Sequence, residues 1–232
     1  MTFPRLFILI ATLMVLSAMP SIAQAQSAYN QYMETLSELN RIDPMQRSSY
    51  ERADKILRRR VLDNKNKVIG EVNDIILSSN GSIESLYVDF NRLRLGPAVY
   101  LNYRQMNISS VSNGYALAFD DNQMENIYPD LLANIATAAG EDEDDTSVKN
   151  VVGATVKSED GRKIGEVKNV LFSANGGRAE VLYLAMAFGV LRGQKVGLPY
   201  GSLEYRPTAG GKAEIIATKE QADAIIDFVK SE

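Results

Sequence analysis

One short sequence pattern occurs twice in this chain, and the repetition constrains the fold more than any other feature. Ile69-Gly70-Glu71-Val72 recurs as Ile164-Gly165-Glu166-Val167. Further matching segments follow each copy in the same order: Asn80-Gly81 and Asn175-Gly176, Leu86-Tyr87-Val88 and Leu182-Tyr183-Leu184, Gly96-x-x-Val99-x-Leu101-x-Tyr103 and Gly193-x-x-Val196-x-Leu198-x-Tyr200. Because the order is kept over so many residues, we expect a duplicated structural unit rather than one domain with a chance similarity.

Both copies have the sequence features of short β-strands. From Ile56 onward, the hydrophobic period shifts toward two, and β-branched residues occupy the segments between turn-forming sequences. This pattern is typical of strands joined by hairpins. Asp63–Asn66 and Ser79–Ser82 are turn segments in the first copy, and Glu159–Arg162 and Asn175–Gly177 are their counterparts in the second. The sequence therefore predicts two small β units in tandem.

The N-terminus has the pattern of a signal peptide. Arg5 precedes an apolar run from Leu6 to Leu16, and Ala23-Gln24-Ala25 is a small-residue cleavage motif. The alternative is a membrane anchor, which needs ~20 apolar residues, but Pro20 and polar neighbours interrupt the run. We expect residues 1–25 to be removed after Ala25, giving a periplasmic or otherwise secreted chain with no stable membrane span.

Residues 26–53 are predicted to form a helical arm. Its apolar residues recur at steps of three and four: Tyr29, Tyr32, Met33, Leu36, Leu39 and Ile42. Asp43-Pro44 should end this helix, since proline disfavours the helical conformation of the residue before it. The arm either packs on the domain that follows or binds a partner as a coiled helix.

Residues 132–147 are predicted to be an acidic, flexible linker between the units. Five successive acids, Glu141 to Asp145, repel one another and are flanked by small polar residues. A calcium loop would need alternating oxygen ligands, a glycine at the sharp turn and a closing glutamate. That order is missing here, so we expect no metal site.

The composition disfavours enzymes and nucleic-acid binders. The chain has no cysteine or histidine, which excludes thiolate nucleophiles, histidine-based triads and imidazole metal ligands. A formal net charge of −4 is unsuited to binding a phosphate backbone. The basic run Arg58-Arg59-Arg60 is interpreted either as a solvated stretch that protects a strand edge or as an anion site.

A carboxylate-dependent hydrolase is the less favoured enzymatic alternative. Glu71 and Glu166 occupy the same place in the two copies, and Asp74 aligns with Asn169. A glycosidase needs two carboxyl groups ~5–9 Å apart in one cleft, and acids duplicated in separate units give no reason to expect that. We expect no catalytic residues and no cofactor.

The repeated motif resembles the PRC-barrel domain, a family named after the photosynthetic reaction centre H subunit and shared with the ribosome maturation factor. The resemblance rests on Ile164-Gly165-Glu166-Val167, the Asn-Gly-type turn and Val196-Gly197-Leu198-Pro199-Tyr200. It covers residues 148–232, and less cleanly residues 54–131, where Asn102 stands in place of Pro199.

The resemblance implies a mainly β protein with two tandem small antiparallel β barrels. Gly70 and Gly165 suit bends or bulges of barrel strands, and Pro199 suits a strand end. Thr218 and Gln221 have the spacing of a capping box, which predicts a C-terminal helix from Lys219 that covers the open end of the second unit.

The resemblance also implies a non-catalytic assembly module that contacts a partner, here an unidentified protein of the cell envelope. The candidate partner-binding residues lie in two matching loops: Phe90, Leu93, Arg94, Phe188, Leu191 and Arg192. Such residues form hot spots when a partner desolvates them, although Phe and Leu are more often buried in the core.

The alternative function is binding of a small ligand or glycan. Tyrosines of both copies could stack on sugars: Tyr87, Tyr100, Tyr103, Tyr183, Tyr200 and Tyr205. Tyrosine is also common in strands because its side chain packs well there, without any ligand. The sequence does not determine the oligomeric state.

Overall fold

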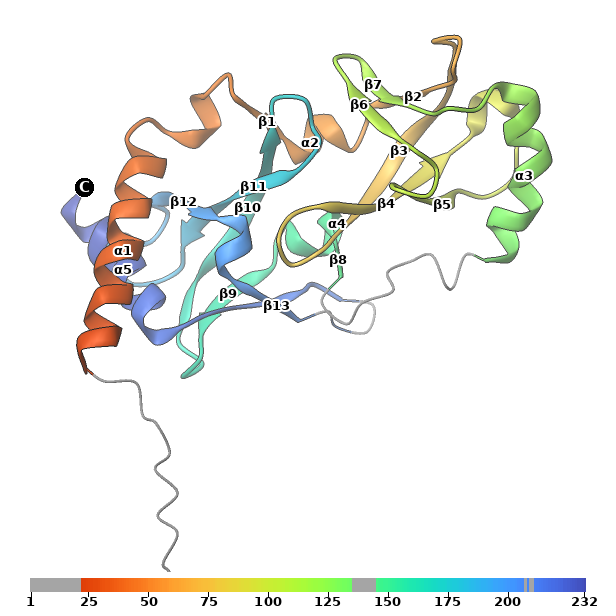
Figure 1. Cartoon of the computed structure of the whole chain (residues 1–232). Coiled ribbons are helices and arrows are strands. Elements are labelled where there is room, and N and C mark those ends of the chain that lie inside the picture. The colour runs from red at the N-terminus through yellow and green to blue at the C-terminus, as the bar shows by residue number, and fades with distance from the viewer. Residues whose placement is uncertain (1–21, 135–144, 207, 209–210) are drawn as a thin grey trace, which may run out of the picture.

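The computed structural model describes residues 22–134, 145–206, 208 and 211–232 (Figure 1). Residues 1–21 of the predicted signal peptide and the acidic residues 141–144 lie outside this range. The described chain is mainly β, with two sheets and five α-helices. The helices are α1 (Ile22–Asn40), α2 (Ala53–Ile56), α3 (Asp121–Ala133), α4 (Val148–Val151) and α5 (Lys219–Ser231).

The two seven-stranded sheets have the same strand order. The first runs β5-β4-β3-β2-β7-β6, and the second runs β12-β11-β10-β9-β14-β13. The strands of the first are β2 (Arg60–Leu62), β3 (Val68–Leu77), β4 (Ile83–Asp89), β5 (Val99–Asn102), β6 (Ser109–Val111) and β7 (Gly114–Ala116), joined by β8 (Thr146–Ser147). Those of the second are β9 (Thr155–Ser158), β10 (Lys163–Ser173), β11 (Ala179–Met186), β12 (Lys195–Pro199), β13 (Glu204–Arg206) and β14 (Glu214–Ala217), joined by β1 (Tyr50–Arg52).

The expectation of two antiparallel β barrels is wrong in two respects. Both sheets are mixed, because β7 runs parallel to β2 and β14 runs parallel to β9. Strands β7 and β14 each form an antiparallel hairpin with the strand before them, β6 and β13. On their other side they pair in parallel with β2 and β9. Among the described residues the end strands do not pair with one another, so each sheet stays open.

Gly70 and Gly165 lie where a long strand approaches its neighbour closely. A Cβ atom on Gly70 would be 2.6 Å from the carbonyl oxygen of Asp89, and one on Gly165 would be 2.6 Å from that of Ala185. Just beyond each glycine the register of strand pairing shifts, between Val72 and Asp74 in β3 and between Val167 and Asn169 in β10. These bulges bend the long strands, and only glycine permits the approach.

The predicted N-terminal and C-terminal helices are confirmed. Helix α5 begins with the capping box of Thr218 and Gln221, whose backbone and side-chain groups bond reciprocally. Helix α1 lies beside α5 and against β12 (Figure 1), with Tyr32 and Leu36 buried. No helix in the described part of the chain is long and apolar enough to cross a membrane.

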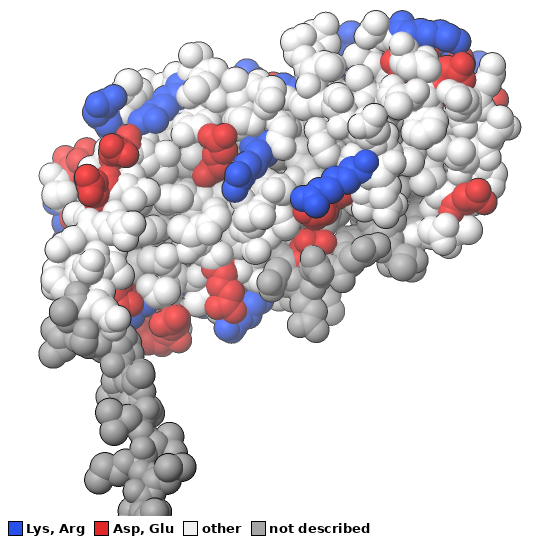
Figure 2. Space-filling view, in the orientation of Figure 1, with Lys and Arg blue, Asp and Glu red and all other residues white. Residues whose placement is uncertain are grey.

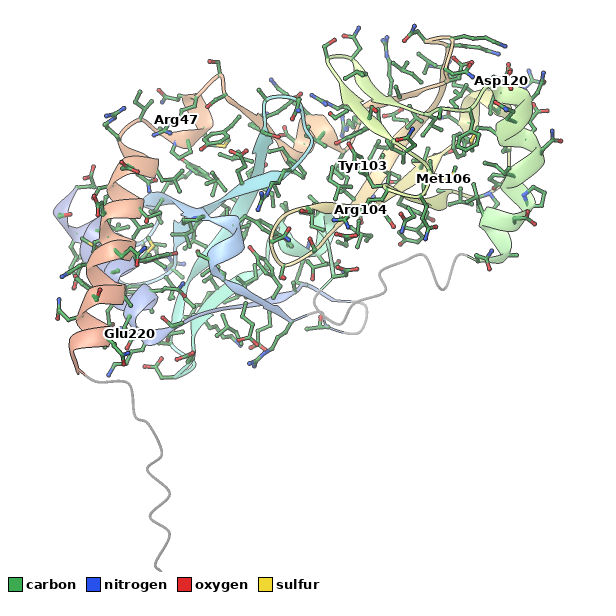
Figure 3. The ribbon with its side chains drawn as sticks, viewed as in Figure 1. Arg47, Tyr103, Arg104, Met106, Asp120 and Glu220 are labelled. Atoms are coloured by element: carbon green, nitrogen blue, oxygen red, sulfur yellow. The ribbon has the colours of Figure 1, made fainter. Side chains whose placement is uncertain are left out.

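Helix α3 was not predicted. It begins at a capping box formed by Asp120 and Gln123, and Asp120 is seen at its start in Figure 3. The short 3₁₀ helices are η1 (Pro44–Gln46), η2 (Asn91–Leu93), η3 (Gly189–Leu191) and η4 (Tyr200–Ser202). Most buried apolar side chains of both sheets belong to one hydrophobic cluster, so the two halves share a continuous core.

Candidate functional site

Each half of the chain contributes one strand to the sheet of the other half. Strand β1 leads directly into α2 and the first sheet, yet it pairs with β10 of the second. Strand β8 leads into α4 and the second sheet, yet it pairs with β3 of the first. The exchange is reciprocal, so strand pairing ties each half of the chain to the other at the junction between them (Figure 1).

The bulge of each long strand holds the short helix of the opposite half. The Asp74 carboxylate accepts a hydrogen bond from the Ser147 hydroxyl at 2.5 Å and one from the Lys149 backbone N–H at 3.3 Å. At the matching bulge, Oδ1 of Asn169 accepts the backbone N–H of Ala53 at 3.0 Å. Both side chains therefore satisfy N–H groups at the start of a helix that would otherwise have no partner.

Burial at this junction raises the pKa of Asp74, and the bonds from Ser147, Ile75 and Lys149 offset only part of the increase. The neighbouring charged and titratable groups are Lys149 on α4, which lowers the pKa of Asp74, and Tyr100 on β5. Because the folded carboxyl binds its proton more tightly than the unfolded one, its contribution to stability falls as pH rises through the raised pKa.

We expect an Asp74→Asn variant to gain stability relative to the wild type as pH rises from about 3 to 7. Asparagine fills the same role at position 169, so the variant should keep the cap while it removes the cost of a buried charge. Thermal melts of both proteins across this pH range provide the measurement. A difference that stays constant with pH, or that favours the wild type at neutral pH, contradicts the interpretation.

Arg59 lies in the first half and binds residues on both sides of the junction. Its side chain is 8% exposed, forms an ion pair with Glu51 of β1, and donates to the carbonyl oxygen of Asn175 at 2.8 Å. The guanidinium also lies over the ring of Tyr115, whose hydroxyl donates to the carbonyl oxygen of Gly176 at 2.7 Å. Within the basic run, only Arg58 and Arg60 are exposed.

The candidate partner-binding residues are distributed between the interior and the surface. Phe90 and Leu191 are buried, and the ring of Phe90 packs edge-on against Tyr128 of α3. Leu93 and Phe188 are half-buried, whereas Arg94 and Arg192 are exposed. The loops belong to different sheets, since one joins β4 to β5 and the other joins β11 to β12.

Sequence reasoning missed Val190 at the tip of the second loop. This side chain is 93% exposed, more than the other exposed large hydrophobic residues in the described range, which are Ile42 at 54% and Leu132 at 39%. Gly189 directly before it and Gly193 three residues after it both have a positive φ, a conformation that glycine adopts readily. The buried Leu191 next to it anchors the loop to the core.

The N-terminal arm covers the edge of β12. The Asn40 side chain accepts the backbone N–H of Gly197 at 2.6 Å and donates to its carbonyl oxygen at 2.9 Å. Asp43 accepts a hydrogen bond from the hydroxyl of Tyr183, and burial together with this carboxylate raises the pKa of Tyr183 to about 12. Arg47, just beyond the arm helix in Figure 3, donates to the carbonyl oxygen of Glu38.

The tyrosines are placed unequally. Tyr200 and Tyr205 are buried with stacked rings, whose centroids lie 4.6 Å apart, so they belong to the core. Tyr87 and Tyr100 are both half-buried, with ring centroids 4.5 Å apart. Tyr103 is half-buried against the ring of Tyr115.

The charged side chains are interspersed rather than concentrated. On the face shown in Figure 2, basic and acidic residues lie next to one another. Glu166 forms an ion pair with Lys168, which lowers the pKa of Glu166. In the described part of the chain, no group of three or more Asp and Glu residues is arranged to hold a metal ion.

Comparison with known families identifies the second half of the chain. Residues 143–222 match the model of the PRC-barrel domain. No curated protein matches the chain. The matched range contains every strand from β8 to β14 and the beginning of α5. Residues 143–222 therefore form a PRC-barrel domain, with the open, mixed sheet described above.

Proposed function

We propose that residues 54–131 are a second copy of the domain found at residues 143–222, so that the chain is a tandem pair of PRC-barrel-like units. Four correspondences support the duplication: the common strand order, the bulged long strand with its glycine, the short helix before the first core strand, and the terminal helix with a capping box. The acidic segment would join the units.

We propose further that the protein is an exported, non-catalytic binding module that makes protein–protein contacts in the cell envelope. The observation that carries this proposal is the loop Phe188–Gly193, whose tip residue Val190 is almost fully exposed. Arg192 is exposed in the same loop. An apolar side chain and an arginine on an anchored loop are suited to a contact that a partner desolvates.

The contacts of the arm are compatible with export. Cleavage after Ala25 would leave Gln26–Asn40 of α1, which includes the buried Tyr32 and Leu36. The same segment keeps Tyr29, whose hydroxyl donates to Asp227 of α5 at 3.1 Å. The mature chain would therefore keep these contacts between the arm and the second unit.

The test is capture of crosslinked partners from an envelope extract with the tagged wild type, a Val190→Asp variant and an Ile42→Asp variant. Both substitutions place a charge at an exposed apolar side chain, so both variants should fold. We expect one specific protein to be captured by the wild type and by Ile42→Asp but lost with Val190→Asp. Equal capture by all three proteins would show that the loop is not the contact.

A further inference from the structure

The outer edge of the second sheet is covered from within the chain. Edge strands present unpaired backbone N–H and C=O groups, with which a further strand can pair unless something covers them. On β12, the end strand of this sheet, the Asn40 side chain binds both the N–H and the carbonyl oxygen of Gly197. Pro199, two residues further on, has no N–H group. At these two positions the edge therefore has no free N–H.

The matching edge of the first sheet is formed by β5. Tyr103 donates its N–H to the carbonyl oxygen of Glu84 at 2.8 Å, which fixes the alternation of hydrogen bonds between β5 and β4. By this alternation Tyr100, which lies opposite Tyr87, directs its N–H and C=O away from β4. Asn102, two residues further on, directs its N–H the same way. These groups face the open side of β5, the end strand of its sheet.

The two edges differ at both of their matching positions. Tyr100 corresponds to Gly197 in the repeated pattern, and each lies opposite a tyrosine of the neighbouring strand. Within the described part of the chain, no side chain binds the backbone of Tyr100 as Asn40 binds that of Gly197. Asn102 replaces Pro199, so this edge has an additional N–H group. The first sheet therefore keeps the groups that pair with a further strand.

Helix α3 meets β5 only near the start of the strand. The Tyr128 hydroxyl donates to the carbonyl oxygen of Pro97, just before β5 begins. Tyr100 and Asn102, further along, are half-buried. The side chain and the carbonyl oxygen of Asn102 accept the N–H groups of residues 104–106 in the following turn. The groups left for a partner are the N–H and C=O of Tyr100 and the N–H of Asn102.

Arginines lie at both ends of this edge. Arg92 and Arg94 belong to the loop before β5, and Arg104 lies in the turn after it (Figure 3). All three are exposed, and none of them forms an ion pair with a described residue. The two acids of β4, Glu84 and Asp89, are half-buried. The exposed charge beside the edge is therefore mainly positive, which favours an acidic occupant.

The arginines also disfavour a second copy of this chain as the occupant. Two copies of β5 that pair about a twofold axis run antiparallel, so the Arg104 end of each strand meets the Arg94 end of the other. Like charges oppose that pairing. An extended segment with carboxylate side chains meets no such repulsion, and its backbone can bond to Tyr100 and Asn102. We propose that the edge of β5 binds an extended acidic segment of a partner protein, which adds a strand to the first sheet.

The test is titration of the full mature chain with a capped peptide of about seven residues in which glutamate and valine alternate. Amide NMR shifts of Tyr100 and Asn102 report binding at the edge. The comparison peptide has lysine in place of glutamate, so it keeps the strand-forming pattern and reverses the charge. We expect saturable shifts with the acidic peptide and binding at least tenfold weaker with the lysine peptide.

Asn102→Pro is the key variant, because it introduces the proline of the second copy and removes the outward N–H. It also removes the side-chain bonds to the turn, so Asn102→Ala, which keeps the N–H, is its control. We expect Asn102→Pro to bind the acidic peptide about tenfold more weakly than Asn102→Ala does. The double variant Arg94→Gln/Arg104→Gln should weaken binding about fivefold. Arg58→Gln/Arg60→Gln removes the same charge elsewhere and should leave binding nearly unchanged.

Val190→Asp should bind the acidic peptide as the wild type does, which separates this edge from the contact proposed for the second loop. The proposal is overturned if the acidic peptide gives no saturable shifts, if the lysine peptide binds equally well, or if Asn102→Pro and Asn102→Ala bind alike. It is also overturned if sedimentation shows a dimer that Asn102→Pro dissociates, because a second copy would then occupy the edge.

Discussion

Replacing Arg59 with alanine is expected to lower the free energy of unfolding by about 3–5 kcal/mol. The substitution leaves Glu51 without its cation, and the Glu51 side chain is only 23% exposed. It also removes the hydrogen bond to the carbonyl oxygen of Asn175 and the contact with the Tyr115 ring. Because Arg59 connects β1, the first sheet and a turn of the second sheet, this loss should weaken the junction between the halves.

Urea unfolding followed by circular dichroism measures this effect, and the adjacent arginine provides the control. Arg58 is exposed, so Arg58→Ala removes the same charge and similar side-chain volume without breaking the cluster. Its effect should stay within about 0.5 kcal/mol. If the two variants lose similar stability, the contacts of Arg59 are not what holds the junction.

Replacing Gly81 with alanine is expected to cost about 3 kcal/mol or more. Gly81 has φ +88°, and a Cβ atom there would be 2.2 Å from the carbonyl oxygen of Ala179. The obstacle is the backbone of the other half, whose Ala179 N–H donates to the carbonyl oxygen of Gly81 at 2.9 Å. Relieving the clash therefore requires the backbone of one half to shift relative to that of the other at this contact.

Gly161→Ala separates the effect of backbone strain from that of the clash. Gly161 has φ +84°, close to that of Gly81, but a Cβ atom there would meet nothing within 4 Å. It should therefore cost only the left-handed conformation, about 1–2 kcal/mol. Equal losses in the two variants, measured by denaturant unfolding, would mean that the contact with Ala179 does not constrain the junction.

Features that depend on neighbouring residues were predictable from the sequence. The capping box of Thr218 and Gln221 begins α5 as expected, because both of its hydrogen bonds form within one helical turn. The helical spacing of the arm likewise identified α1, and Tyr32 and Leu36 on its predicted apolar face are buried. The same local rule could have found α3, since Asp120 and Gln123 have the spacing of a capping box.

The surface loop was predicted only in part. A sequence pattern shows that Phe90, Leu93 and Arg94 are close in the chain, but not which of them points inward. Packing against Tyr128 buries Phe90. In the matching loop, Val190 is almost fully exposed while the adjacent Leu191 is buried, between two glycines with positive φ.

The repeated strand pattern and the helices at both ends could be predicted from the sequence alone. The open, mixed sheets, the exchange of β1 and β8, and the burial of one arginine among three depend on the tertiary fold. These features join residues that are far apart in the chain. Arg59 donates to Asn175, a residue 116 positions away, and Asp74 holds Ser147, 73 positions away. Local propensity cannot specify such partners, because they meet only after both halves have folded against each other.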